Sequence, residues 1–168
     1  EEMKAAVDER VDFERRLRLA LAKGELLLYY QPIIAAQDGS LLALEALLRW
    51  NSAKLGSVSP VKFIPVAEDT RLITPIGEWV LYTACREAAC WPGSTKVAVN
   101  VSADQLSSPG FVGSVVKALA HSNLPPSRLE LEVTESVFLR EVSGAMATLD
   151  QVRALGVRLS LDDFGTGY

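Results

Sequence analysis

The stretch KVAVNVS at residues 96–102 decides the fold that this sequence predicts. Larger aliphatic side chains alternate along it with small or polar ones, which is typical of a β-strand. Two later stretches repeat the design, RLELEVTES at 128–136 and VRLSLDDFG at 157–165. A helical stretch separates each of them from the one before, at about the length of one βαβ unit. Strands that alternate with helices predict a parallel sheet in an α/β protein.

Helical patterns fill the segments between the predicted strands. One begins just after Pro75, another begins at Pro109 and the last ends before Gly156, in keeping with proline at helix starts and glycine at helix ends. We therefore expect helices at residues 60–69, 76–91, 109–121 and 143–155.

The first two predicted strands depart from this alternation. ELLLYYQPI at 25–33 and SLLALEALLRW at 40–50 are joined by QDGS at 37–40, which is a tight turn signal. Two strands joined in this way form an antiparallel hairpin. The sequence thus predicts a sheet whose first strand is antiparallel.

Residues 1–24 precede the strands and differ from them in pattern. They are rich in charge, and Phe13, Leu17 and Leu21 recur at helical spacing, so an amphipathic helix is expected. Two interpretations stay open: a solvated helix that caps the domain, or a connector from an upstream domain. The domain itself is expected to span residues 25–168.

Length and composition exclude several classes of protein. The 168 residues, 49% of them hydrophobic, suffice for one domain with a real core. With 17 basic and 21 acidic residues the formal charge is −4, so no broad basic field attracts a polynucleotide. No run of about eighteen apolar residues and no signal peptide pattern occurs, so we expect a cytoplasmic location and no direct membrane insertion of this piece. Cys85 and Cys90 are expected to be reduced, core-filling residues.

One face of the predicted sheet is polar. Successive side chains of a strand point to opposite faces, and in each strand one set is rich in polar groups. Most of these lie near the C-terminal ends of their strands, where α/β barrels build active sites. Asn100 and Glu132 are 32 residues apart, and Glu132 and Asp162 are 30 apart, about one βαβ unit each. The face carries Tyr29 and Gln31; Ala43, Glu45, Leu47 and Arg49; Ala98, Asn100 and Ser102; Glu130, Glu132 and Thr134; and Ser160 and Asp162.

Carboxylates gathered at such a rim would resist ionisation unless a cation lay among them. The candidate ligands offer only oxygen, which favours Mg²⁺ or Mn²⁺ over zinc or copper and leaves Ca²⁺ open. Asp163 directly follows Asp162, which suggests a second ion, because two-metal sites need carboxylates on both ions. Any one acid could instead cap a helix or form a salt bridge, but the joint pattern favours the site. The candidate metal ligands and catalytic residues are Glu45, Asn100, Glu132, Asp162 and Asp163.

Six ordered blocks of the sequence resemble the EAL domain of bacterial cyclic-di-GMP phosphodiesterases, over roughly residues 25–168. The resemblance implies a TIM-like (β/α) barrel with an antiparallel first strand, and metal-dependent hydrolysis of cyclic-di-GMP to linear pGpG. The family's catalytic lysine and a further glutamate lie on later strands. Residues 1–168 are therefore expected to hold only the N-terminal part of the barrel and to be inactive alone. The blocks are LEALLRW (44–50), FIPVAED (63–69), IGEWVL (76–81), NVSADQL (100–106), LEVTES (131–136) and DDFGTGY (162–168).

The resemblance also implies roles for individual residues and partners. In the family the loop FGTGY, here at 164–168, is linked with dimerisation and activity, so a homodimer is one implied partner. An upstream sensory or diguanylate cyclase domain is another. The family's metal ligands match Glu45, Asn100, Glu132 and Asp162, its second-metal residue Asp163, its substrate-contacting positions Gln31, Leu47 and Arg49, and its loop-organising residues Thr134 and Glu135.

Three questions stay open at the level of sequence. The domain could cleave cyclic-di-GMP, or it could bind the dinucleotide without cleaving it and act as a receptor; the intact motifs favour cleavage. Trp50 could lie in the core, or it could stack near a guanine beside Arg49. Arg71 stands where the family commonly has glycine, which puts the local turn in doubt.

Overall fold

The structure, a computed structural model, describes the backbone of residues 2–134 and 144–162 and the side chains of residues 9–134 and 144–161. Of the predicted site residues, Glu135 and Asp163 lie outside the described residues, and Asp162 is described only as backbone. The elements are α1 (Glu2–Ala20), β1 (Leu26–Ile34), β2 (Leu41–Ser52), β3 (Gly56–Val58), α2 (Pro60–Asp69), α3 (Ile73–Ala89), β4 (Lys96–Val101), α4 (Ala103–Leu106), α5 (Phe111–Ser122), the 3₁₀ turn η1 (Pro126–Arg128), β5 (Leu129–Thr134), α7 (Ala145–Ala154) and β6 (Arg158–Asp162).

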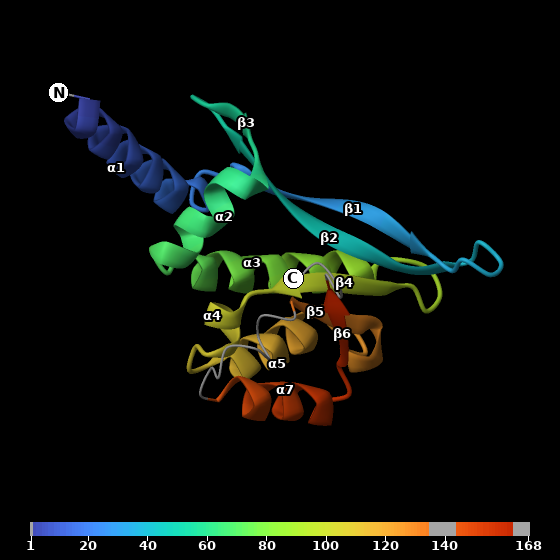
Figure 1. Cartoon of the computed structure of the whole chain (residues 1–168). Coiled ribbons are helices and arrows are strands. Elements are labelled where there is room, and N and C mark those ends of the chain that lie inside the picture. Colours follow the sequence, from blue (N-terminus) through green and yellow to red (C-terminus); the bar gives the residue numbers. More distant parts are fainter. Residues whose placement is uncertain (1, 135–143, 163–168) are drawn as a thin grey trace.

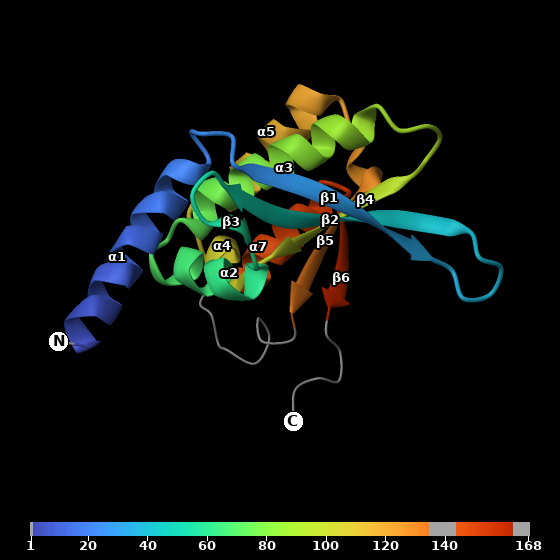
Figure 2. The same ribbon diagram turned by 90° about the horizontal axis from the view of Figure 1, so that it is seen from above.

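The strands form one mixed sheet in the order β1-β2-β4-β5-β6, with β3 paired to β2. β1 runs antiparallel to β2, whereas β2, β4, β5 and β6 are parallel to one another. Helix α5 packs between α3 and α7 along this sheet, and α1 stands out at one end (Figures 1 and 2). None of the described helices has both the length and the apolar composition needed to span a bilayer. The arrangement confirms the predicted α/β fold and its antiparallel first strand.

The strand register puts the predicted polar residues on one face of the sheet. Residues that pair laterally in parallel strands share a face. Asn100 pairs with Glu132, and Glu132 pairs with Ser160. Residues of the other parity are buried in the core that the helices cover, as the alternation predicts. On β4 and β5 these are Val97, Val99, Val101, Leu129, Leu131 and Val133.

Some element boundaries differ from the prediction. Helix α2 spans the predicted residues 60–69, but α3 begins at Ile73 rather than after Pro75, and α5 begins at Phe111. Proline fits anywhere in the first turn, because the N–H groups there have no partner within the helix. Strand β3 and helix α4 were not predicted, since elements of three and four residues are too short to show a period.

Arg71 keeps the turn that follows α2. Its backbone has a φ of 59°, in the left-handed region that glycine favours. Its N–H still bonds to the carbonyl of Glu68 at 3.0 Å. The turn therefore forms although arginine stands where the family commonly has glycine.

Trp50, near the end of β2, belongs to the hydrophobic core. Its ring is 0% exposed and makes edge contacts with Phe13 of α1 and Phe63 of α2, at centroid distances of 5.2 and 5.8 Å. Its Nε1 donates a hydrogen bond to Glu25 Oε2 at 3.0 Å. The alternative in which Trp50 stacks on a guanine is therefore wrong, because the indole points to the face opposite Arg49.

We expect Glu25 to make folding stability depend on acid pH. The indole N–H of Trp50, and then the backbone N–H of Ala53, bond to its carboxylate and lower the pKa below the ordinary value of 4.5. Because the carboxyl has a lower pKa in the folded protein than in the unfolded chain, its contribution to stability is complete at pH values above the unfolded pKa. The contribution is lost as the pH falls through the folded pKa. Glu25→Gln keeps an acceptor but cannot ionise, so its melting temperature should fall less steeply with acid than that of the wild type. Equal slopes in parallel titrations would contradict this.

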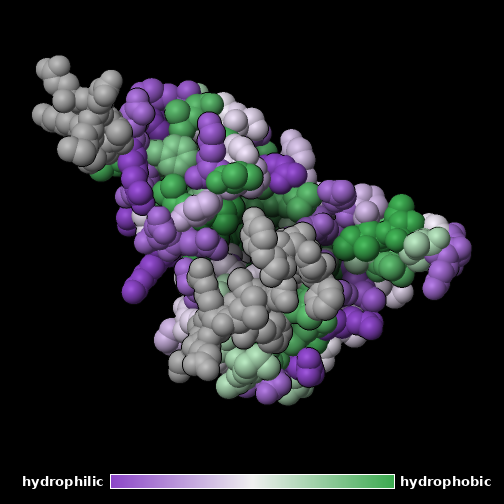
Figure 3. All heavy atoms as spheres, viewed as in Figure 1, coloured by the Kyte–Doolittle hydropathy of each residue, from purple (hydrophilic) through white to green (hydrophobic). Residues whose placement is uncertain are grey.

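The predicted hairpin of β1 and β2 is confirmed, and it reaches past the neighbouring strands (Figure 2). Pairing runs unbroken from Leu26–Trp50 to Ile33–Ala43 and then shifts by one residue. Leu42 is therefore an extra residue on β2, which is a β-bulge. The tip of the hairpin carries an apolar surface (Figure 3), to which the exposed side chains of Ile34, Leu41 and Leu42 contribute.

Both cysteines are free thiols, as predicted. Cys85 is buried in α3, and burial raises the pKa of its thiol to about 12. Cys90 is exposed just beyond the end of α3, so the prediction that it fills the core is wrong. Cys90 comes one residue after the last residue of α3, so its side chain does not belong to the face of the helix that packs on the sheet.

Candidate functional site

Asn100 and Glu45 form the centre of the polar face. The amide Nδ2 of Asn100 donates a hydrogen bond to Glu45 Oε1 at 2.8 Å, between the neighbouring strands β4 and β2. This bond uses one of the two N–H groups of the amide and does not involve its oxygen, so Asn100 can offer Oδ1 to a cation. Two residues predicted from separate motifs are thus in direct contact.

Glu132 and Ser160 continue this face across β5 and β6. Glu132 lies between Asn100 and Ser160 in the register and is half-buried. The Ser160 hydroxyl oxygen is buried and has no hydrogen-bond partner among the described residues. A buried hydroxyl is costly without a partner. This part of the face therefore suits a bound water, ion or ligand.

The donor set fits a hard divalent cation. Glu45 and Glu132 offer carboxylate oxygens and Asn100 an amide oxygen, with the Ser160 hydroxyl beside them, and oxygen is what Mg²⁺ and Mn²⁺ prefer. Over the residues that the structure describes, no three His, Cys, Asp or Glu side chains gather closely enough to hold an ion. The side chains of Asp162 and Asp163 are outside that description. The five-residue ligand set stays a prediction.

The predicted substrate residues also share the face of Glu45. Opposed residues of an antiparallel pair point to the same side, and Gln31 of β1 pairs with Glu45. Tyr29 of β1 pairs with Leu47, and its ring lies 5.6 Å from the guanidinium carbon of Arg49. Arg49 also donates from Nη1 to the carbonyl of Leu48 at 2.9 Å. A guanidinium has five N–H groups, so this bond occupies only one of them.

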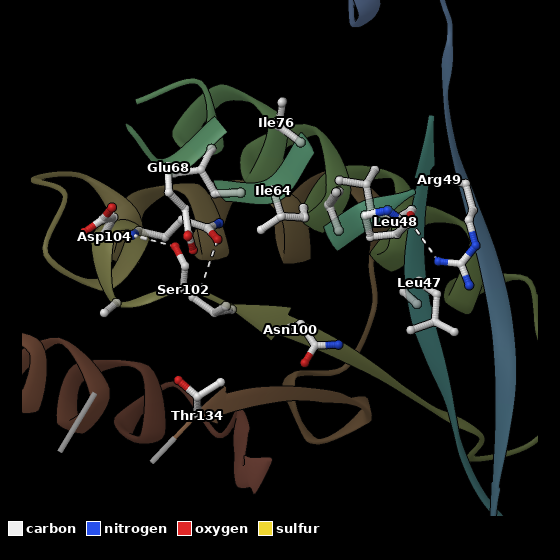
Figure 4. Close-up of a pocket in the computed structure, with 17 residues that line it drawn as sticks. Leu47, Leu48, Arg49, Ile64, Glu68, Ile76, Asn100, Ser102, Asp104 and Thr134 are labelled. Carbon is white, nitrogen blue, oxygen red and sulfur yellow. Dashed lines mark hydrogen bonds between the residues drawn. The ribbon is translucent and has the colours of Figure 1, made fainter. Parts of the chain in front are cut away.

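A cavity of about 440 Å³ opens beside the second half of β2 and the end of β4, beneath α2 and beside α3 and α4. Figure 4 shows its two kinds of wall, with Arg49 and Asn100 on the strands and Ile64 and Ile76 on the helices. The polar lining comprises Arg49, Glu68, Asn100, Ser102, Asp104, Gln105 and Thr134, and the apolar lining includes Leu47, Leu48, Ile64, Ile73, Ile76 and Val80.

The helix side of this cavity was not predicted as part of a site. Ile64 and Glu68 lie in the block FIPVAED, and Ile76 lies in IGEWVL. Those blocks carried the family resemblance, but nothing in their chemistry indicated a ligand. Only the position of α2 over the strand ends reveals their place. Thr134, predicted to organise a loop, lines the cavity as well.

In an α/β protein, a cavity and polar residues that meet toward the C-terminal ends of the parallel strands define a small-molecule site. The sequence profile described as the EAL domain matches residues 14–168. The chain therefore belongs to the EAL domain family.

Relatives of known name and structure agree with this assignment. The chain is 44% identical over 99% of its length to the bifunctional diguanylate cyclase/cyclic di-GMP phosphodiesterase MucR of Pseudomonas aeruginosa, and it spans 25% of that protein. A solved MucR phosphodiesterase in complex with c-di-GMP is 46% identical, with a TM-score of 0.86 over 92% of this chain and 64% of its own. The FimX EAL domain of Xanthomonas citri, in complex with c-diGMP, is 28% identical with a TM-score of 0.85, over 98% of this chain and 65% of its own.

Proposed function

We propose that this chain is part of a phosphodiesterase that hydrolyses cyclic-di-GMP to linear pGpG with the help of divalent cations. The observation that carries the proposal is the contact between Glu45 and Asn100, which lines the cavity and pairs in register with Glu132. The name of MucR and its solved complex with c-di-GMP support the choice of substrate.

In this proposal Glu45, Asn100 and Glu132 hold a Mg²⁺ or Mn²⁺ ion through their oxygens. Asp162 and Asp163 complete a site for two ions, which can also take Ca²⁺. When bound, such ions lower the pKa of a coordinated water and offset charge on a phosphate. The bond from Asn100 fixes the orientation of the Glu45 carboxylate before any ion arrives. The site is therefore partly preorganised, which is how a protein holds an ion at a defined place.

The dinucleotide is proposed to be held by the residues around this centre. Arg49 gives its remaining N–H groups to a phosphate oxygen, and Gln31 lies beside Glu45 to bond a polar atom of the ligand. Leu47 and Ile64, both only partly buried, offer an apolar surface to a flat base. Thr134 and Glu135 are proposed to organise the loop that follows β6.

The partners are proposed at the level of the whole protein. MucR is named as bifunctional, which supports a diguanylate cyclase or sensory domain upstream of α1 here. A homodimer and a cytoplasmic location are proposed on the family resemblance.

The experiment that tests the proposal measures pGpG. The whole protein, of which this chain is part, is purified and incubated with cyclic-di-GMP and Mn²⁺, and the product is separated by chromatography; a second sample contains excess chelator. We expect pGpG with Mn²⁺ and none with chelator. Equal turnover in both would exclude the cation mechanism. Binding without turnover at any cation concentration would favour the alternative function, a receptor that binds cyclic-di-GMP without cleaving it.

Arg49→Ala should weaken cyclic-di-GMP binding by about 1.5–3 kcal/mol, the range of a hydrogen bond to a charged group. Calorimetric titration in Ca²⁺ or with a non-hydrolysable analogue gives the dissociation constant. Arg49→Lys keeps the positive charge but loses the planar guanidinium. Its affinity for cyclic-di-GMP should therefore lie between that of the wild type and that of Arg49→Ala. An unchanged dissociation constant for Arg49→Ala would remove Arg49 from the site.

A further inference from the structure

Gln105 is a buried polar side chain in an unusual place. It is 6% exposed and lies in α4, a helix of only four residues, Ala103–Leu106. Its side-chain Oε1 accepts a hydrogen bond from the backbone N–H of Ser102 at 3.1 Å. The backbone N–H of Gln105 in turn donates to Ser102 Oγ at 3.3 Å. This reciprocal pair is a capping box. The cavity view in Figure 4 draws both bonds at Ser102 as dashed lines.

The far end of Gln105 is seated on Gly77 of α3. A Cβ atom at residue 77 would lie 1.8 Å from Gln105 Nε2 and 2.7 Å from its Cδ, so the amide fills the space that any other residue would need. Gly77 is not among the glycines with a positive φ, which means that this glycine serves close approach and not a special backbone conformation. The contact joins two motif blocks, IGEWVL and NVSADQL, that the sequence alone leaves unconnected.

These contacts fix where β4 ends. A four-residue helix has no stability of its own, so the capping box and the seat on α3 determine its position. Ser102, which caps it, comes two residues after Asn100 and has the same parity. The end of the strand that carries Asn100 is therefore tied to α3 through Gln105.

We propose that Gln105 is a positioning residue: seated on Gly77, it holds the end of β4 so that the Asn100 amide meets Glu45 in the geometry that binds the cation. The inference rests on the proposed function, because that function makes Asn100 a ligand. Gln105 lines the cavity, but in this proposal it acts on the ion through Asn100 and not by direct contact.

Metal binding without substrate tests this inference. Mn²⁺ is titrated into the purified protein by calorimetry, and the melting temperature is measured separately in chelator. Gln105→Met, which keeps the length but removes the acceptor, should weaken Mn²⁺ binding about tenfold, the lower end of what outer-sphere partners contribute. Gln105→Glu keeps a side-chain oxygen that can accept the bond from Ser102, because capping boxes use either Glu or Gln at this position. This variant should bind Mn²⁺ with an affinity within about threefold of the wild type. Gln151→Met, at an exposed glutamine of α7, is the matched control and should change nothing.

A double-mutant cycle separates positioning from a general loss of stability. Gly77→Ala pushes on the Gln105 amide and should weaken Mn²⁺ binding in the wild-type background, but not in Gln105→Ala, where no amide remains to be displaced. Additive effects would overturn the inference, as would a wild-type affinity in Gln105→Met or an affinity of Gln105→Glu as weak as that of Gln105→Met. A wild-type protein that binds no Mn²⁺ would overturn the proposed function and this inference with it.

Discussion

Glu132→Gln should lower kcat/KM for cyclic-di-GMP by about a thousandfold. The change keeps the size of the side chain and a hydrogen-bonding oxygen but removes a negative charge from the proposed ion site. A bound cation supplies several kcal/mol of stabilisation to a transition state on phosphate, and each 1.36 kcal/mol is a factor of ten in rate. Initial rates of pGpG formation at saturating Mn²⁺ measure the effect.

Glu130→Gln is the matched control for this substitution. Glu130 lies on the same face of β5 two residues earlier, but it pairs with Ala98 and Arg158 instead of Asn100 and Ser160. The control variant should stay within about twofold of the wild type, as expected for a residue outside the metal centre. If both variants lose activity equally, the loss follows from charge on the strand and Glu132 has no special place.

Trp50→Ala should lower the free energy of unfolding by about 3–5 kcal/mol, the range for removing a large aromatic side chain from a core. Trp50 joins three elements, because its ring in β2 contacts Phe13 of α1 and Phe63 of α2. Urea unfolding followed by circular dichroism gives the difference.

Trp50→Phe separates packing from hydrogen bonding. It keeps an aromatic ring in the core but loses the indole N–H that bonds Glu25, so its loss should be only about 1–2 kcal/mol. A loss as large as that of Trp50→Ala would mean that the bond to Glu25, and not the packing of the ring, holds this end of the sheet.

The strands and their polar face were accessible from sequence because strand alternation is a local signal. The parity of Asn100 and Glu132 is set within six-residue runs, and parallel pairing then brings their side chains to one face. The hypothesis that Trp50 stacks on a guanine was wrong because it did not apply this alternation. Trp50 directly follows Arg49 in the strand, so its side chain points to the opposite face. The hypothesis relied instead on the place of Trp50 beside Arg49 in the block LEALLRW.

The helix wall of the cavity depends on packing that no local pattern encodes. Ile64 and Ile76 face the strand ends only because α2 and α3 are arranged over them. Gln105 had a visible signal, the Ser-x-x-Gln spacing from Ser102, which is typical of a helix start. Its burial on Gly77 could not be predicted, because it depends on a contact between segments 28 residues apart in the chain.

The extra residue Leu42 lies between the regular pairing of the β1–β2 hairpin and its turn, and these two parts differ in how well they tolerate insertions and deletions. The pairing from Leu26 to Ile33 decides which side chains of β1 stand beside Glu45, and a slip of one residue there would turn Gln31 to the other side. The bulge lies between that pairing and the turn at residues 35–40, so it can absorb a change in the length of the turn. Evolution can therefore lengthen or shorten this turn while Gln31 keeps its neighbour, and a reporter peptide grafted there should leave ligand binding intact.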